Sequence, residues 1–262
     1  MFKSLFSRRL RRWWWTTLLV IAAVGVMIRL GVWQLDRLAE RRIFNARVNA
    51  QIAQPTLTLT ADSLDTALAE MEYRPVVVVG TYDPAQEVAL RNQVWQGQLG
   101  VHLLTPLVIA GSDRAVLVNR GWVPADETDW GKFAETGTVT VKGIIRLSQS
   151  KPDFGGLPDL EGQLRLWNMV NVERITEQIS HPMLPIYIQE APDPAWTSLP
   201  YRTQPQLDLS EGSHFGYAIQ WFLFAAVLGI GYPFYVRDSL RRAQTHTSET
   251  LAVQRILNDH SV

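Results

Sequence analysis

The 262-residue sequence contains no cysteine, which excludes disulfide bonds, iron–sulfur clusters and thiolate metal sites. Only five methionines are present, so the soft sulfur ligands that copper(I) prefers are scarce and a copper carrier is disfavoured. The lack of cysteine does not assign a redox compartment, because many exported proteins also have no disulfide. The absence of cysteine therefore excludes these kinds of site but does not indicate the compartment in which the protein lies.

Sequence patterns for several common activities are also missing. No phosphate-binding loop, dinucleotide fingerprint or nucleophile elbow occurs. Five histidines are present, but no two lie at metal-ligand spacing on one predicted helix, as a zinc hydrolase would need. The acidic central segment disfavours nucleic-acid binding. We therefore predict a protein that is not an enzyme, with a catalytic triad that leaves no sequence signature as the open alternative.

Acidic residues are missing from the N-terminal segment. Residues 1–35 contain six basic residues and no acidic ones, whereas residues 36–213 contain 15 basic and 22 acidic residues. The whole chain has a formal net charge of zero, so its average hides a division into segments. Such asymmetry indicates where a chain is placed rather than how it folds.

Two long segments have no charge at all, namely residues 13–28 and 215–236. A helix over residues 13–35 would rise about 34 Å, enough to cross the ~30 Å hydrocarbon layer, and the second run is also long enough. A cleaved signal peptide is the alternative for the first run, but the run is longer than usual and "GVWQLDR" is no small-residue cleavage site. We therefore predict transmembrane helices over residues 13–35 and 214–236, with aromatic residues at their ends.

Basic residues flank both predicted spans on the same side of the membrane. They occur in the N-terminal segment, residues 1–12, and in the tail, residues 237–262. The positive-inside rule then places both termini in the cytoplasm and residues 36–213 outside. The sequence thus predicts a bacterial inner-membrane protein with two spans.

The central segment is large enough for one domain, and β-strand signals dominate it. A helix-prone stalk covers residues 36–54, and a short helix is predicted over residues 63–71 with Ser63 as its N-cap. The turn Gly111-Ser112-Asp113 between two apolar runs predicts a hairpin. Strands are predicted over residues 74–82, 87–93, 97–109, 114–124, 137–147, 165–170 and 184–190, and a helix over residues 171–180. The expected fold class is an α+β membrane protein, with two transmembrane helices flanking one mostly antiparallel β domain.

One titratable side chain stands at the edge of the second charge-free run. His214 precedes this run, and helical spacing puts Tyr217 and Trp221 on its side, whereas Gln220 lies beside Tyr217. A neutral imidazole can ligate iron, and the apolar surroundings would suit a porphyrin. The alternatives are an interfacial histidine with no ligand and a glutamine that bonds to the first span.

Arg29 lies toward the outer end of the first span, and we expect it to be level with His214. A guanidinium pairs well with a carboxylate such as a haem propionate. The alternative is that Arg29 only extends its charged end to the lipid headgroups. On the second span Ala218, Ala225 and Gly229 form a stripe of small residues, which would let another helix or a flat ligand come close.

Five motifs in a fixed order resemble the Surfeit locus protein 1 family of cytochrome c oxidase assembly factors. They are "LGVWQLDR", "GTYDP", "GVHLLTPL", "VLVNRGWVP" and "HFGYAIQWFLFA", and the resemblance covers residues 13–240. It implies two membrane helices around one β-rich domain and a role in building the haem-copper oxidase as haem a enters the catalytic subunit. The implied partners are cytochrome c oxidase subunit I and also haem a synthase or other assembly factors.

The resemblance also implies particular site residues. The family's second-span histidine, a proposed ligand of the haem iron, falls on His214, and neighbouring motif positions fall on Tyr217, Gln220 and Trp221. Arg120 is expected either to reach a haem propionate or to be structural. The other matching positions are Trp33, Gln34, Gly100, Asn119, Gly121 and Trp122.

One departure from the family pattern follows Gly100, where the usual aromatic residue is replaced by Val101 and then His102. His102 is expected to be either a structural histidine or a second polar contact. The alternative to haem binding as a whole is a haem-free membrane scaffold that stabilises an immature oxidase subunit or a haem synthase.

Overall fold

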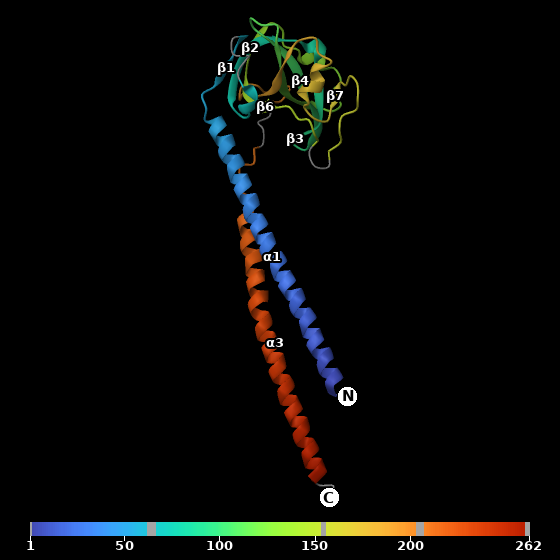
Figure 1. Ribbon diagram of the computed structural model, residues 1–262. Helices are drawn as coiled ribbons and strands as arrows, with labels where there is room; N and C mark the ends of the chain where they lie inside the picture. Colours follow the sequence, from blue (N-terminus) through green and yellow to red (C-terminus); the bar gives the residue numbers. More distant parts are fainter. Residues whose placement is uncertain (1, 62–66, 153–155, 203–206, 260–262) are drawn as a thin grey trace. The chain divides into compact units, whose positions relative to one another are not determined.

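The computed structural model describes residues 2–61, 67–152, 156–202 and 207–259. The chain divides into two compact units, one formed by Met1–Phe44 with Leu209–Val262 and the other by Asn45–Asp208. The first unit is helical and the second is mostly β-sheet (Figure 1).

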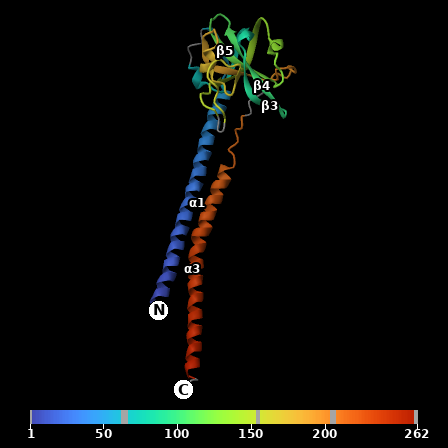
Figure 2. The same cartoon turned by 90° about the vertical axis from the view of Figure 1, so that its right-hand side faces the viewer.

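Two long helices, α1 (Phe2–Ile52) and α3 (His214–Asp259), run side by side in the helical unit (Figures 1 and 2). α1 joins the predicted span and the predicted stalk in one uninterrupted helix, which ends shortly before Pro55 because proline disfavours helix in the residue before it. α3 begins at His214, where the second span is predicted to start. Both helices are long and apolar enough to cross a membrane by length and composition.

The two helices pack along a seam with a seven-residue repeat. At positions spaced alternately by three and four residues, the side chains are buried or half-buried, a pattern typical of a left-handed helix pair. Small residues make room at the seam: the Phe222 ring packs over Gly31, where an added Cβ atom would lie 2.7 Å from it, and Ala218 and Ala225 are buried. The seam positions are 17, 20, 24, 27, 31, 34 and 38 on α1 and 214, 218, 221, 225, 228 and 232 on α3.

The β unit contains the predicted strands and also a short one, Leu57–Leu59, that was not predicted, with shorter elements between them. The strands are β1 (Leu57–Leu59), β2 (Pro75–Tyr82), β3 (Val88–Trp95), β4 (Gln98–Ile109), β5 (Ala115–Pro124), β6 (Thr138–Leu147), β7 (Leu166–Trp167) and β8 (Met183–Glu190). The helical pieces are α2 (Val172–Thr176), η2 (Leu68–Glu70), η3 (Pro84–Gln86) and η4 (Trp130–Phe133). β7 and α2 are thus shorter than predicted. Of the helix predicted over residues 63–71, the structure describes residues 67–71, and within these it has the single turn η2. Ser63 lies outside the described residues.

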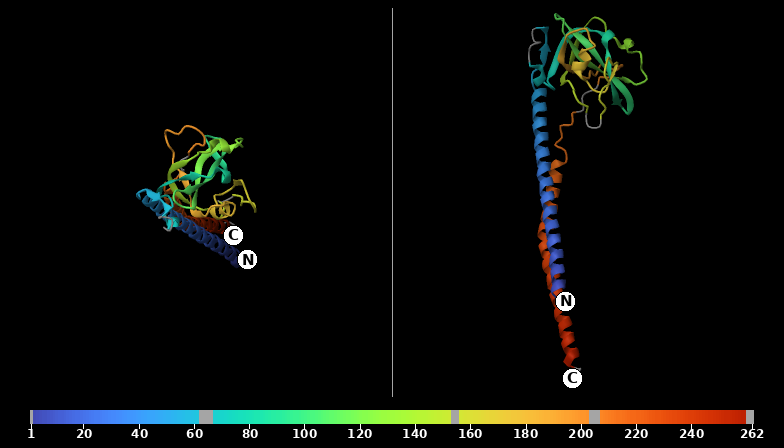
Figure 3. Two further views of the ribbon diagram at one scale, coloured as in Figure 1. Left: turned by 90° about the horizontal axis from the view of Figure 1, so that it is seen from above. Right: turned by 45° about the vertical axis from the view of Figure 1, so that its right-hand side comes forward.

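The sheet closes on itself to form a small barrel, which the sequence did not predict. β4 is long enough to pair with β3 in its first half and with β2 in its second half, where Gly80 lies opposite Ile109. Strands β2, β6, β8, β5 and β4 therefore form a closed circuit (Figure 3). Most pairings are antiparallel, as predicted; β1–β2, β3–β7 and β5–β8 are parallel. β4 and β5, labelled in Figure 2, form the hairpin predicted at Gly111-Ser112-Asp113.

The main apolar core fills the inside of this barrel. Its buried side chains come from the five strands of the closed circuit, and Leu59 and Leu68 add to it from outside the circuit. Alternate residues of a barrel strand point inward, so closure lets all five strands share one core. A second cluster packs Trp167 and α2 against the outer part of the sheet.

Candidate functional site

His214 contacts Gln34 at one end of the helical pair. Nδ1 of His214 lies 2.8 Å from Oε1 of Gln34. An amide oxygen can only accept a hydrogen bond, so Nδ1 must donate its proton. In the neutral imidazole the other ring nitrogen, Nε2, then carries a free lone pair, which is the form of histidine that binds a metal ion. The imidazole is half-buried on the seam.

Contacts to α1 hold the segment that leads into α3. Arg42 forms two hydrogen bonds of 2.8 Å with the carboxylate of Glu211, and Nε of Arg41 donates to the carbonyl oxygen of Ser210 at 3.1 Å. The hydrogen bond from Arg42 lowers the pKa of the Glu211 carboxyl. These groups are exposed to solvent, so each contact contributes little by itself, but together they place the start of α3 opposite Gln34. The sequence shows the charges of these residues but not that they pair.

Arg29 is not level with His214, which corrects the prediction. Gln34 is the α1 residue that contacts His214, and Arg29 lies five residues before it, about 7.5 Å along the helix axis and on an exposed face. Arg37 lies about one helical turn after Gln34 along α1, whereas Arg29 lies before it. Its guanidinium stands 5.7 Å from the centre of the Trp33 ring and bonds to Glu40 at 2.6 Å. Arg37 is therefore better placed than Arg29 to pair with an anion at His214.

The other predicted residues of the second span lie around α3 rather than in one cluster. Tyr217 is half exposed, and Trp221 lies on the seam with its ring edge against Phe224, the ring centres being 6.2 Å apart. Gln220 is exposed and forms no hydrogen bond within the described chain, so the predicted bond from Gln220 to the first span is not found. The amide at His214 belongs to Gln34 instead.

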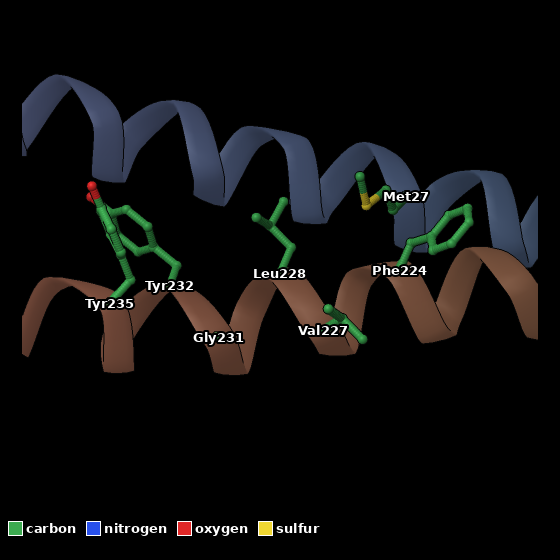
Figure 4. Close-up of a pocket in the computed structure, with 7 residues that line it drawn as sticks. All are labelled: Met27, Phe224, Val227, Leu228, Gly231, Tyr232 and Tyr235. Atoms are coloured by element: carbon green, nitrogen blue, oxygen red, sulfur yellow. The ribbon is translucent and has the colours of Figure 1, made fainter. Parts of the chain in front are cut away.

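An apolar groove lies further along the helical pair. In Figure 4, Met27 of α1 lies beside Phe224 of α3, and further along α3 the side chains of Leu228 and Tyr232 point toward α1. These residues line a hollow of about 470 Å³. None of its seven lining residues is a histidine or carries a charge. Phe224 is ten residues beyond His214, or about 15 Å along the helix, so this groove is separate from the histidine.

The motif "NRGWVP" lies on β5 and forms part of the barrel framework. Trp122 is buried, donates from Nε1 to the carbonyl oxygen of Gln93 at 3.1 Å and stacks on Tyr201 with ring centres 6.2 Å apart. Gly100 is required beneath the indole, because a Cβ atom there would lie 2.2 Å from Trp122 Nε1. Gly121 has φ of 120°, and a Cβ atom there would lie 2.4 Å from the Tyr201 carbonyl oxygen. These residues therefore have structural roles.

Arg120 is the extra residue of a β-bulge in β5, because Leu103 pairs with Gly121 and Leu104 with Asn119. Its side chain is almost fully buried and bonds to Glu87 at 3.1 Å and to Glu135 at 3.0 Å. Its charge also lies 4.9 Å from the centre of the Tyr82 ring. The guanidinium is thus enclosed by protein groups, and we place it in the domain framework rather than at a haem propionate.

A second buried ion pair extends this network. Nη2 of Arg202 lies 3.0 Å from Oε1 of Glu190, and Arg202 also approaches Glu135 at 4.0 Å. Burial raises the pKa of Glu190 to about 7, although Arg202 opposes the shift. The network thus links the segment before α3 to the barrel within the β unit. The sequence analysis did not identify Glu87, Glu190 or Arg202 as members of a buried network. The sequence feature that could have indicated it is that both carboxylates stand at the end of an apolar strand.

His102 is a buried structural histidine. Nδ2 of Asn119 donates to Nδ1 of His102 at 3.1 Å, and Oδ1 of Asn119 accepts from the backbone N–H of Gly121 at 3.1 Å. Burial lowers the pKa of His102 to about 4, so the ring is neutral at pH 7. Val101, where the resemblance predicts an aromatic residue, packs in a small apolar cluster with Trp130. The described residues contain no group of three or more histidine, aspartate or glutamate side chains that could hold a metal ion.

Comparison with known proteins relates the chain to one family. Residues 21–226 match the model of the SURF1 family. A SURF1-like protein of Monosiga brevicollis is 28% identical over 214 residues, covering 76% of this chain and 78% of that protein. A SURF1-like protein of Rickettsia felis is 26% identical over 223 residues, covering 81% and 93%. Surfeit locus protein 1 of Xenopus tropicalis is 25% identical over 211 residues, covering 74% and 66%.

Proposed function

The chain belongs to the SURF1 family, generally known as cytochrome oxidase assembly factors, and we propose that it assists oxidase assembly by holding haem a at His214. The observation that carries the proposal is the hydrogen bond from Nδ1 of His214 to Gln34. In the neutral ring this bond leaves Nε2 as the basic nitrogen. Histidines that ligate a metal generally donate their other ring N–H to a fixed acceptor in this way.

The donor set around His214 suits a haem. When bound, a haem would supply an iron that accepts a nitrogen ligand and two anionic propionates. Nε2 of His214 would hold the iron, and Gln34 orients the ring through Nδ1. Arg37, one turn from Gln34, offers a guanidinium for a propionate because its exposed bond to Glu40 contributes little. Trp33 and Tyr217, both partly exposed, provide flat apolar surface beside the histidine.

The proposed site is open rather than enclosed, and this suits a carrier. The histidine is half-buried, and among the described residues it would be the one protein ligand of the iron. A single ligand allows the group to leave for a higher-affinity acceptor, which we propose is the catalytic subunit of the oxidase. The proposed topology has both termini in the cytoplasm and the β unit outside, so that His214 lies at the outer face of the membrane.

A haem-free scaffold is the second candidate, and the β3–β4 hairpin favours it. Val94 and Leu99 are cross-strand neighbours near its tip and are 67% and 57% exposed. Paired exposed apolar side chains on a hairpin are suited to contact a partner protein. This surface would serve an immature oxidase subunit or a haem synthase whether or not His214 binds haem.

Absorption spectra separate the two candidates. The full chain is purified from cells that make haem a, together with the variants His214→Ala and His181→Ala. We expect a haem spectrum for the wild type and for His181→Ala, which alters a histidine of the β unit, and its loss in His214→Ala. Haem-free wild-type protein, or equal haem content in His214→Ala, would exclude the ligand role and leave the scaffold.

A further inference from the structure

A second groove lies on the helical pair at the end that carries the chain termini. It has a volume of about 750 Å³ and runs between α1 and α3, with Val20 and Val24 on one wall and Gly229 and Pro233 on the other. The hollow exists partly because Gly229 has no side chain. Proline has no N–H, so the Gly229 carbonyl also lacks the usual donor four residues later. Most of the side chains that line the groove are nevertheless apolar.

Two arginines lie at one end of the groove. Arg237 and Arg241 line it together with Leu240, and they are one helical turn apart. Both are exposed, and neither forms an ion pair among the described side chains. Two like charges at this spacing repel each other, so an anion between them would relieve the repulsion.

The neighbouring Arg242 behaves differently. Its Nη2 atom lies 2.8 Å from the carboxylate of Asp238, four residues before it. Asp238 therefore neutralises the charge of Arg242, whereas the charges of Arg237 and Arg241 at the groove have no acidic partner among the described side chains. Charge complementarity thus points to an anionic occupant at this end, whereas the rest of the groove requires an apolar one.

We propose that this groove binds an anionic phospholipid. Its acyl chain lies along the wall formed by Val20, Val24 and Gly229, and its phosphate pairs with Arg237 and Arg241. Guanidinium groups bind phosphate oxygens through paired N–H donors, and basic pockets between membrane helices recognise anionic headgroups in this way. The inference uses the membrane placement of the helices but not haem binding.

Native mass spectrometry of the full chain in detergent micelles tests the proposal. The protein is titrated with phosphatidylglycerol and, separately, with phosphatidylcholine of identical acyl chains. We expect the phosphatidylglycerol adduct at about tenfold lower lipid concentration, because two guanidiniums contribute to binding. The double variant Arg237→Gln/Arg241→Gln should lose this preference. Gly229→Leu, which fills the groove, should weaken binding of both lipids.

Arg242→Gln is the matched control for Arg241→Gln, because each removes one positive charge from the same helical turn. Arg242→Gln should keep the preference for phosphatidylglycerol, and unchanged far-UV circular dichroism shows that each variant is folded. Equal binding of the two lipids by the wild type would overturn the proposal. The proposal would also be overturned if Arg241→Gln and Arg242→Gln reduced the preference for phosphatidylglycerol equally. That result would indicate only a general attraction between positive charge and anionic lipid. Two-chain species without lipid would show that a second copy of the chain occupies the groove.

Discussion

Nδ1 of His214 lies 2.8 Å from Oε1 of Gln34, although the two residues are 180 positions apart in the sequence. The contact joins the end of the first predicted span, residues 13–35, to the start of the second, residues 214–236. Each of the motifs "VWQL" and "HFGYAIQ" therefore contains half of the arrangement. The histidine supplies the ring, and the glutamine decides which of its nitrogens is free.

The first prediction concerns Gln34→Leu, which removes the acceptor for Nδ1. The ring then has no partner to keep Nε2 deprotonated and directed toward a ligand, so haem affinity should fall by about tenfold or more. Titration of the purified full chain with haem, followed by absorption, measures this affinity. Gln220→Leu is the control, because Gln220 is an exposed amide on α3. Equal affinities for the two variants would show that Gln34 does not position the histidine.

The second prediction concerns the buried charge of Arg120. Arg120→Met leaves Glu87 and Glu135 without their shared partner, and breaking a buried ion pair in this way costs about 3–5 kcal/mol. The midpoint of thermal unfolding of the β unit in the full chain, measured by tryptophan fluorescence, should fall by several degrees. Lys142→Met, on an exposed position of β6, should change it little. Similar midpoints for both variants would mean that Arg120 is not essential to the framework.

The third prediction uses the raised pKa of Glu190, which is about 7 because of burial. The folded state holds this proton more tightly than the unfolded chain, so the stabilisation is present below pH 4.5 and is lost as the pH rises through 7. Glu190→Gln mimics the protonated form and should gain stability relative to the wild type as the pH rises from 5 to 8. The difference should reach about 2–3 kcal/mol. A constant difference in unfolding free energy across this range would contradict the assigned protonation.

The fourth prediction uses the lowered pKa of His102, which is about 4 because of burial. The folded state resists protonation, so the contribution to stability is present above pH 6.5 and is lost as the pH falls through 4. Histidine-selective NMR should show ring signals of His102 that stay constant from pH 8 to pH 5.5. A midpoint near pH 6.5 would instead mean that the ring is reached by solvent.

The fifth prediction concerns membrane topology. A reporter enzyme that is active only outside the cytoplasm should be active when fused after Asp159 and silent when fused at the C-terminus. The reason is that the basic residues flank both spans on one side. Activity at the C-terminus with silence at Asp159 would reverse the orientation and place His214 at the cytoplasmic face.

Much of the β unit could be predicted from local patterns. The valine run of β2 and the turn at Gly111-Ser112-Asp113 identify a strand and a hairpin because strand propensity and turn geometry depend on neighbouring residues. Barrel closure could not be predicted, because it depends on β4 being shared between β3 and β2. The same limit applies to Arg120: the sequence left a ligand contact and a structural role open, and only the bulge and its buried acidic partners distinguish them.

The sequence by itself determined the two apolar helices, the acidic segment between them and the family motifs. Length, charge and residue order are properties of the chain that do not depend on tertiary contacts. Only the tertiary structure decided which side chains meet. The seam between α1 and α3 brings Gln34, rather than Arg29 or Gln220, to His214, since helix register and the close approach at Gly31 set which turns face each other. The same seam leaves Arg237 and Arg241 beside an open groove. Such relationships are properties of packing between distant segments, and no local pattern contains them.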